Sequence, residues 1–172
     1  MKRWLLTLFL SLLIIFPVFS SSLSIGVDLG ALDSFFLDGK RVGGAIGFRY
    51  GKIRASLDVQ YAFDLEREYS LLDVGASIDV YPFSSLGLFF GVDLLRYGRF
   101  FGAGSPVERN VFFSSIRIGW TFSFPYFYIE PRLVITDPAR LSQDSLSSLS
   151  ESFLYYGNYY FALMIGIQID GL

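Results

Sequence analysis

Several stretches of the chain place charged side chains among alternating apolar residues, and these charges determine what chemistry it could perform. Asp58, Asp73 and Asp93 fall in three successive stretches. Neighbouring carboxylates repel one another unless they hold a proton or are neutralised by a cation. Two opposed carboxylates can also cleave a glycosidic bond by acid–base chemistry. The pattern therefore indicates an ion-pair network, with a hydrolytic carboxylate pair as a minor alternative.

The composition excludes much other chemistry. The chain has 172 residues, with no histidine and no cysteine. It therefore offers no imidazole base, no thiolate nucleophile, no haem attachment and no histidine–cysteine zinc site. A net charge of −2 without a long basic run argues against nucleic acid as a partner. We expect a protein without enzymatic activity, cofactor or bound metal.

Residues 1–20 have the features of a secretory signal peptide. Lys2 and Arg3 give a positive start, residues 4–19 are almost entirely apolar, and serines follow. The apolar run is shorter than the about 20 residues that a membrane-spanning helix needs. We expect cleavage after Ser20 or within the next two residues, which leaves one domain at 21–172.

Apolar and polar residues alternate with a period of two through most of 21–172. This period is typical of β-strands with one apolar face. Eight such stretches lie at 23–29, 42–50, 53–63, 72–80, 86–94, 112–124, 127–135 and 159–169. Strands of about 9–11 residues can cross a bilayer when tilted. Pro131 cannot donate to a strand ladder, so it predicts a weak or bulged point in the seventh strand.

The connections between these stretches fall into two classes. The tight ones are 50–52, 82–85 and 124–126, and the longer ones are 32–40, 64–68, 97–109 and 137–156. Short turns at one end and long loops at the other are typical of outer-membrane barrels. An even number of strands would leave both termini at the short-turn, periplasmic end.

The last long connection contains a helix start signal. In Asp137-Pro138 the aspartate can cap a helix and the proline suits its first turn. Leucines then recur at roughly helical spacing among serines. Residues 138–153 are therefore expected to form either a short surface helix or a serine-rich loop.

Alternation does not tell which face lies inside. A lipocalin-like barrel has the same pattern with its apolar face in the lumen. Lys40 and Lys52 are the only lysines after residue 20, far fewer than a water-facing wall needs. The polar face is mostly Gly, Ser, Ala and Thr, whereas the other face is aliphatic and aromatic. We predict that the apolar face meets lipid, and a soluble periplasmic binding barrel is the alternative.

Aromatic residues gather near the strand ends. One group is Tyr50, Tyr81, Phe83, Phe124 and Tyr126, and the other is Tyr61, Phe63, Tyr69, Phe112 and Tyr159. Two such groups fit the aromatic girdles found at membrane interfaces.

With these features the chain resembles the small eight-stranded outer-membrane barrels, the OmpA-like and OmpX-like group. The resemblance covers about residues 23–170 and is one of architecture. It implies an all-β, up-and-down transmembrane barrel in the outer membrane of a didermic bacterium. It also implies outer-membrane lipids, the barrel-assembly machinery and periplasmic chaperones as partners. Such barrels end in an alternating strand with a terminal aromatic residue, whereas this chain has Leu172 there.

On this register the lumen is strongly charged. The inward-pointing charged residues are Asp28, Arg49 and the eight that we assign to a luminal charge network: Arg54, Asp58, Asp73, Asp79, Asp93, Arg117, Glu130 and Arg132. An eight-strand lumen is only wide enough for side chains. We therefore interpret the network as a plug, with a small pore or proton path as the functional alternative.

A second group of residues forms a candidate surface contact. Arg96, Tyr97, Arg99, Phe100 and Phe101 make a basic–aromatic cluster at the outer end of the fifth strand. It could contact anionic lipid sugars or a host molecule. An interfacial girdle with snorkelling arginines is the favoured interpretation.

These features favour a non-enzymatic surface protein that supports the envelope or mediates adhesion through long loops. A small channel or hydrophobic-solute conduit is the first alternative, and the soluble barrel is the second. Known eight-stranded lipid A acylases and deacylases use a histidine, so a lipid-modifying enzyme would need a different base in this chain.

Overall fold

The computed structural model of the chain describes residues 22–28, 40–64, 69–83, 85–102, 109–138 and 159–171. The expected signal peptide at 1–20 lies outside these described residues. The same holds for residues 139–153, where a helix or a serine-rich loop is expected. Within the described residues, no helix is long and apolar enough to cross a membrane.

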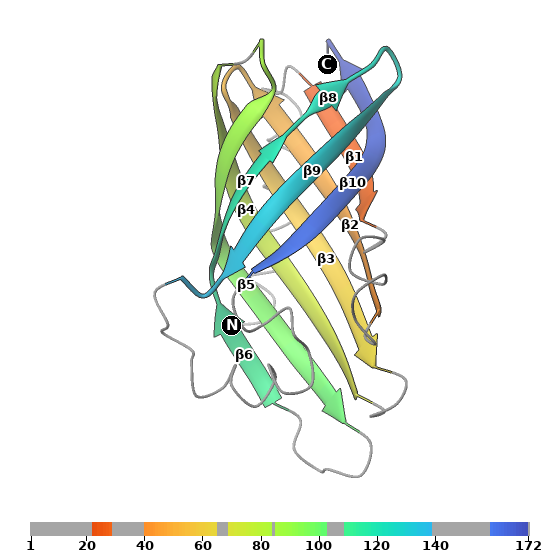
Figure 1. Cartoon of the computed structure of the whole chain (residues 1–172), viewed down its shortest axis with the longest axis vertical. Helices are drawn as coiled ribbons and strands as arrows, with labels where there is room; N and C mark the ends of the chain where they lie inside the picture. The colour runs from red at the N-terminus through yellow and green to blue at the C-terminus, as the bar shows by residue number, and fades with distance from the viewer. Residues whose placement is uncertain are drawn as a thin grey trace, which may run out of the picture.

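The described residues form ten β-segments wrapped around a single lumen (Figure 1). They are β1 (Ser22–Asp28), β2 (Lys40–Tyr50), β3 (Ile53–Asp64), β4 (Tyr69–Phe83), β5 (Leu88–Gly102), β6 (Arg109–Phe113), β7 (Ser115–Trp120), β8 (Phe122–Ser123), β9 (Phe127–Thr136) and β10 (Tyr159–Asp170). Segments β6, β7 and β8 follow one another with single-residue breaks at Ser114 and Thr121. They form one barrel strand, so the wall has eight strands.

The sheet closes on itself through its first and last strands. β1 pairs with β10 from Ser22↔Asp170 to Asp28↔Met164, and β10 pairs in turn with β9. Every other strand pairs antiparallel with its neighbours in the sequence. Closure removes the free edges that would otherwise expose unpaired backbone groups. The eight-stranded antiparallel barrel expected from the sequence is confirmed.

Tight turns gather at one end of the barrel, beside the C-terminus (Figure 1). Gly51 in the β2–β3 turn has a φ of 57° and Gly87 in the β4–β5 turn has a φ of 72°. Residues that carry a side chain rarely adopt this positive-φ backbone conformation, so glycine suits both positions. At Gly87 a Cβ would also lie 2.2 Å from the carbonyl oxygen of Thr121. The strand ends that the longer connections join lie at the opposite end, as expected; we call the two ends of the barrel the turn end and the loop end.

One extra residue interrupts β5 near its middle. Ala76 of β4 faces Leu95, but the next residue, Ser77, faces Asp93, so Leu94 has no partner. This is a β-bulge, in which two residues of one strand oppose one of its neighbour. The expected fifth strand, 86–94, is therefore too short, because strict alternation stops at the bulge. The expected loop 97–109 is wrong for residues 97–102, which continue β5.

Pro131 marks a break on only one side of its strand. It pairs with Leu163 of β10 without interruption. On the other side the β7–β9 ladder ends at Gly119↔Arg132 and resumes in β8 at Phe122↔Ile129. The expected weak point therefore lies between β7 and β9. There the backbone N–H of Thr121 donates to the carbonyl of Gly87, at 2.9 Å.

Candidate functional site: the charged lumen

Polarity is inverted between the wall and the interior of the barrel. On the outward face, Val74 is 47% exposed, Phe90 48% and Ile167 52%. On the inward face Asp79 and Glu130 are completely buried. This arrangement is the opposite of a lipocalin-like barrel, whose apolar face lines the lumen.

The first charge cluster surrounds Arg54 of β3. Its Nε donates to Asp79 on the neighbouring β4, at 2.9 Å. Its two terminal nitrogens donate to the two oxygens of Glu130 on β9, at 2.7 and 2.9 Å. A guanidinium that meets a carboxylate at two parallel bonds is a strong and directional pairing. Arg54 therefore bridges the lumen.

Two further arginines share the same carboxylates. Arg117 Nε donates to the second oxygen of Asp79 at 2.6 Å, and Arg132 Nε donates to Glu130 at 2.5 Å. The Thr121 hydroxyl also donates to Glu130, at 2.6 Å. Three arginines in this cluster thus face two carboxylates. Arg54 and Asp79, both assigned to the luminal charge network from the sequence, are direct cross-strand partners.

The second cluster surrounds Arg96, which is only 4% exposed. Its Nη2 donates to both oxygens of Asp58 at 2.5 and 2.6 Å, and its Nη1 donates to Asp73 at 2.6 Å. Its Nε donates to Asp93 at 2.7 Å, and the Ser115 hydroxyl donates to the same carboxylate. The three carboxylates, which the sequence places in successive strands, gather around a cation that the sequence analysis assigns to the outer surface.

Arg96 is therefore a correction to the expected surface cluster. Strict alternation from Asp93 points Arg96 outward. The bulge instead leaves both Leu94 and Leu95 on the outer face, at 64% and 59% exposure, which returns Arg96 to the lumen. Two leucines in succession after an alternating stretch are the only sequence signal of this shift.

The remainder of the expected surface cluster is divided by the same alternation. Arg99 and Phe101 are exposed on the outer face of β5, and Tyr97 is half-buried there. Phe100 belongs to β5, but its side chain lies outside the described part of the structure. Tyr81 is a second correction. It is only 1% exposed and lies in the lumen, so it does not belong to the girdle at the turn end.

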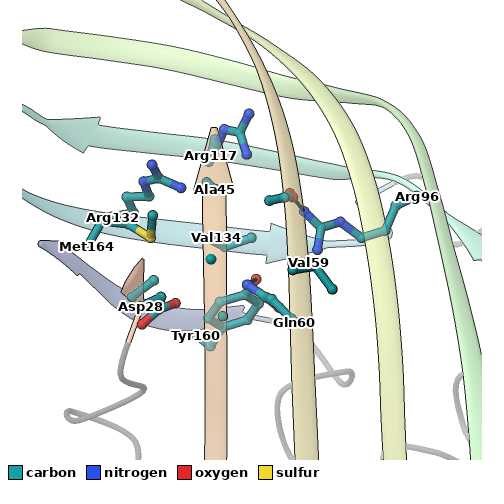
Figure 2. Close-up of a pocket in the computed structure, with 14 residues that line it drawn as sticks. Asp28, Ala45, Val59, Gln60, Arg96, Arg117, Arg132, Val134, Tyr160 and Met164 are labelled. Atoms are coloured by element: carbon teal, nitrogen blue, oxygen red, sulfur yellow. Dashed lines mark hydrogen bonds and ion pairs between the residues drawn. The ribbon is translucent and has the colours of Figure 1, made fainter. Parts of the chain in front are cut away.

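A small cavity of about 20 Å³ lies between the two charge clusters (Figure 2). Arg117 and Arg132 line one side, and Tyr160 and Gln60 line another. Arg117 Nη1 lies 3.6 Å from Asp93, which is the link between the clusters. Arg117 Nη2 and Asp93 Oδ1 are buried without a hydrogen-bond partner among the described atoms. The cavity has about the volume of one water molecule.

A third ion pair lies toward the loop end. Arg41 Nη2 is 3.2 Å from Asp28, and both side chains are buried. The Arg41 guanidinium also lies 4.2 Å above the Tyr160 ring, and Gln60 donates to the Tyr160 hydroxyl at 3.4 Å. Arg41 is absent from the predicted network because the predicted second strand begins at Val42. Extending that predicted strand by one residue, with the same period of two, places the Arg41 side chain on the inward face.

Aromatic side chains close the lumen toward the turn end. Tyr81, Phe89 and Tyr128 are each at most 2% exposed. The Tyr81 hydroxyl hydrogen-bonds to that of Thr121 at 3.2 Å, which ties this layer to the first charge cluster. Arg49 is half-buried above the Tyr81 ring at 4.1 Å, so it lies at the mouth of the barrel rather than in the network.

Comparison with solved structures identifies similar β-barrels. The crystal structure of the N-terminal β-barrel domain of Pseudomonas aeruginosa OprF aligns with a TM-score of 0.56 and 15% identity, over 87% of this chain and 98% of that one. Neisserial surface protein A (NspA) aligns with a TM-score of 0.49 and 13% identity, over 87% of this chain and 96% of that one. No protein-family model matches the chain, and no curated protein does. At 15% identity, the likeness to the OprF domain establishes the β-barrel fold alone.

Proposed function

We propose that the chain is an integral outer-membrane β-barrel protein of a didermic bacterium, with a plugged lumen and no catalytic activity. Its partners would be outer-membrane lipids and, during insertion, periplasmic chaperones and the barrel-assembly machinery. The inversion of polarity carries this proposal. The wall presents aliphatic and aromatic side chains from every strand, whereas the buried charged side chains lie in the lumen. Soluble monomers rarely expose apolar patches beyond a few hundred Å².

The filled lumen supports a structural role in the envelope. Two ion-pair clusters and an aromatic layer occupy the interior one after another, and the cavity between the clusters has room for about one water molecule. Within the described residues, charged groups held at 2.5–2.9 Å from their partners span the lumen, which supports a plug rather than an open channel. We therefore propose that the barrel stabilises the outer membrane and presents its long loops at the cell surface for adhesion.

Refolding of residues 21–172 into detergent tests the membrane assignment. Unboiled and boiled samples on an SDS gel should migrate differently, with β-rich circular dichroism in the unboiled form. A matched pair of variants sharpens the test in lipid vesicles. Val74→Arg on the outer face should lose about 2–4 kcal/mol of stability if it lies at bilayer depth. Lys52→Arg in the exposed turn should change nothing. A chain that stays soluble and monomeric without detergent would overturn the assignment.

Protease treatment of intact cells tests the orientation and the surface role. We propose that both termini, at the turn end, face the periplasm and that the long connections face outward. Cleavage should then occur within 29–39, 103–108 or 139–158, while an N-terminal tag placed after residue 20 stays protected. If every loop stays uncut, the adhesion role fails.

Planar-bilayer recording distinguishes the plug from a channel. A plugged lumen predicts no reproducible unit conductance from the wild-type barrel. A reproducible conductance would favour the small-channel alternative.

A further inference from the structure

One position on the outward face of the barrel departs from its apolar character. Among the described strand side chains that face outward, Arg99 is the only charged one. It lies on β5 toward the loop end, two residues beyond Tyr97. A charged side chain on a lipid-facing wall is costly at mid-depth and cheap only near the interface. Arg99 therefore marks where the apolar band ends on this side.

The strand register builds a defined group around Arg99. Asn110 of β6 is its direct cross-strand partner, and Tyr97 pairs likewise with Phe112. The Tyr97 and Phe112 rings pack with centroids 5.0 Å apart, and the Arg99 guanidinium lies 5.3 Å from the centre of the Phe101 ring. We call these five residues, Tyr97, Arg99, Phe101, Asn110 and Phe112, the rim cluster.

Hydrogen bonding within the rim cluster orients its polar groups. The Tyr97 hydroxyl donates to Asn110 Oδ1 at 2.7 Å, which occupies the acceptor side of that amide. The amide NH₂ of Asn110 is a donor, and so is every nitrogen of the Arg99 guanidinium. Cross-strand partners on one face have Cβ atoms about 4.5–5.5 Å apart. The cationic Arg99 guanidinium and the Asn110 amide NH₂, which are both hydrogen-bond donors, therefore lie next to each other.

The apolar surroundings indicate what kind of anion fits. Leu72 of β4 is the cross-strand partner of Arg99 on its other side. Phe112 of β6 lies two residues closer to the middle of the barrel than Asn110. Leu94 and Leu95, both more than half exposed, continue the same surface toward the middle of the barrel. A free anion would gain nothing from these side chains. A lipid would place its acyl chains along them and its headgroup at the rim.

We propose that the rim cluster binds the phosphate of an anionic membrane lipid, with Arg99 and Asn110 donating to its oxygens and the leucines contacting its acyl chains. This site rests on the proposed membrane function and names the partner at one end of the wall. A planar guanidinium suits phosphate oxygens because it donates two parallel hydrogen bonds. The Arg99 guanidinium lies beside the Phe101 ring, and interfacial aromatic residues sit at the level of the lipid headgroups.

Lipid titration of the refolded barrel in a maltoside detergent, which contains no phosphate, tests the site. The melting temperature of the band-shifted form is followed as a short-chain phosphatidylglycerol is added, which gives an apparent Kd. Arg99→Gln should weaken this Kd roughly tenfold, the loss of one charge-assisted contact. Arg99→Lys should keep part of the affinity, and Asn110→Ala should weaken it by a smaller factor.

Two controls distinguish lipid binding at the rim cluster from a general effect of protein charge or of phosphate on the melting temperature. Lys52→Gln removes the same charge from the exposed turn at the opposite end and should leave the Kd unchanged. Inorganic phosphate at the same concentrations should not raise the melting temperature. An equal loss in Lys52→Gln and Arg99→Gln, or an equal effect of inorganic phosphate, would overturn the lipid site. Failure of the wild-type chain to fold in detergent would instead overturn the membrane assignment itself.

Discussion

Replacing Arg96 with methionine removes the cation shared by three buried carboxylates while keeping a long side chain in the lumen. Breaking a buried ion pair by removing one partner costs about 3–5 kcal/mol, because the other charge is left uncompensated. Arg96 donates to Asp58, Asp73 and Asp93 at 2.5–2.7 Å, and its side chain is 4% exposed. We therefore expect Arg96→Met to cost about 5 kcal/mol, at the upper end of this range.

The free energy of unfolding in urea, followed by the gel band shift, measures this cost. Arg99→Met is the matched control, because it changes the same residue type three positions along β5 on the exposed face. It should change stability by at most about 0.5 kcal/mol. A further variant combines Arg96→Met with Asp58→Asn, Asp73→Asn and Asp93→Asn, and it should recover most of the loss. If Arg96→Met costs no more than Arg99→Met, the luminal network does not stabilise the barrel.

Three further changes test the packing of the lumen. Ala45→Leu places apolar atoms in the cavity beside Arg117, whose buried Nη2 has no hydrogen-bond partner among the described atoms, so it should cost about 1–3 kcal/mol in the urea assay; an increase in stability would mean that this atom needs no polar partner there. Gly26→Ala should cost about 1–3 kcal/mol, since its Cβ would lie 2.1 Å from the Tyr128 hydroxyl oxygen; Tyr128→Phe in the same chain should restore part of it, and strict additivity would contradict this contact. Deleting Leu94 should be tolerated in the gel shift, since it makes the ladders on both sides of β5 continuous and leaves Arg96 inward; deleting Val74, where no bulge exists, should abolish the folded band.

Much of the fold can be predicted from the sequence because a β-strand has an invariant period of two. That period is sufficient to assign Asp58, Asp73 and Glu130 to one face. The scarcity of lysine is sufficient to choose which face lies inside. The pairing of Arg54 with Asp79 follows from counting residues through a tight turn.

The remaining features depend on departures from that period. A bulge has no fixed sequence pattern. The sequence alone therefore does not show that Leu94 is the additional residue or that Arg96 faces the lumen. The contact between Arg54 and Glu130 crosses the lumen between strands that are not neighbours. It depends on how the wall curves, which pairwise strand counting does not include.

The two luminal clusters differ in which contacts must form before they can exist. Asp58, Asp73 and Asp93 with Arg96 come from β3, β4 and β5, which are consecutive along the chain. Two hairpins are enough to assemble them, so this cluster can form in a sheet that is still open. Arg54 and Glu130 are 76 residues apart and meet only when β9 stands opposite β3. The contact between Arg54 and Glu130 is therefore an internal marker of completed assembly. A probe at Glu130 would distinguish a closed barrel from an inserted but open sheet.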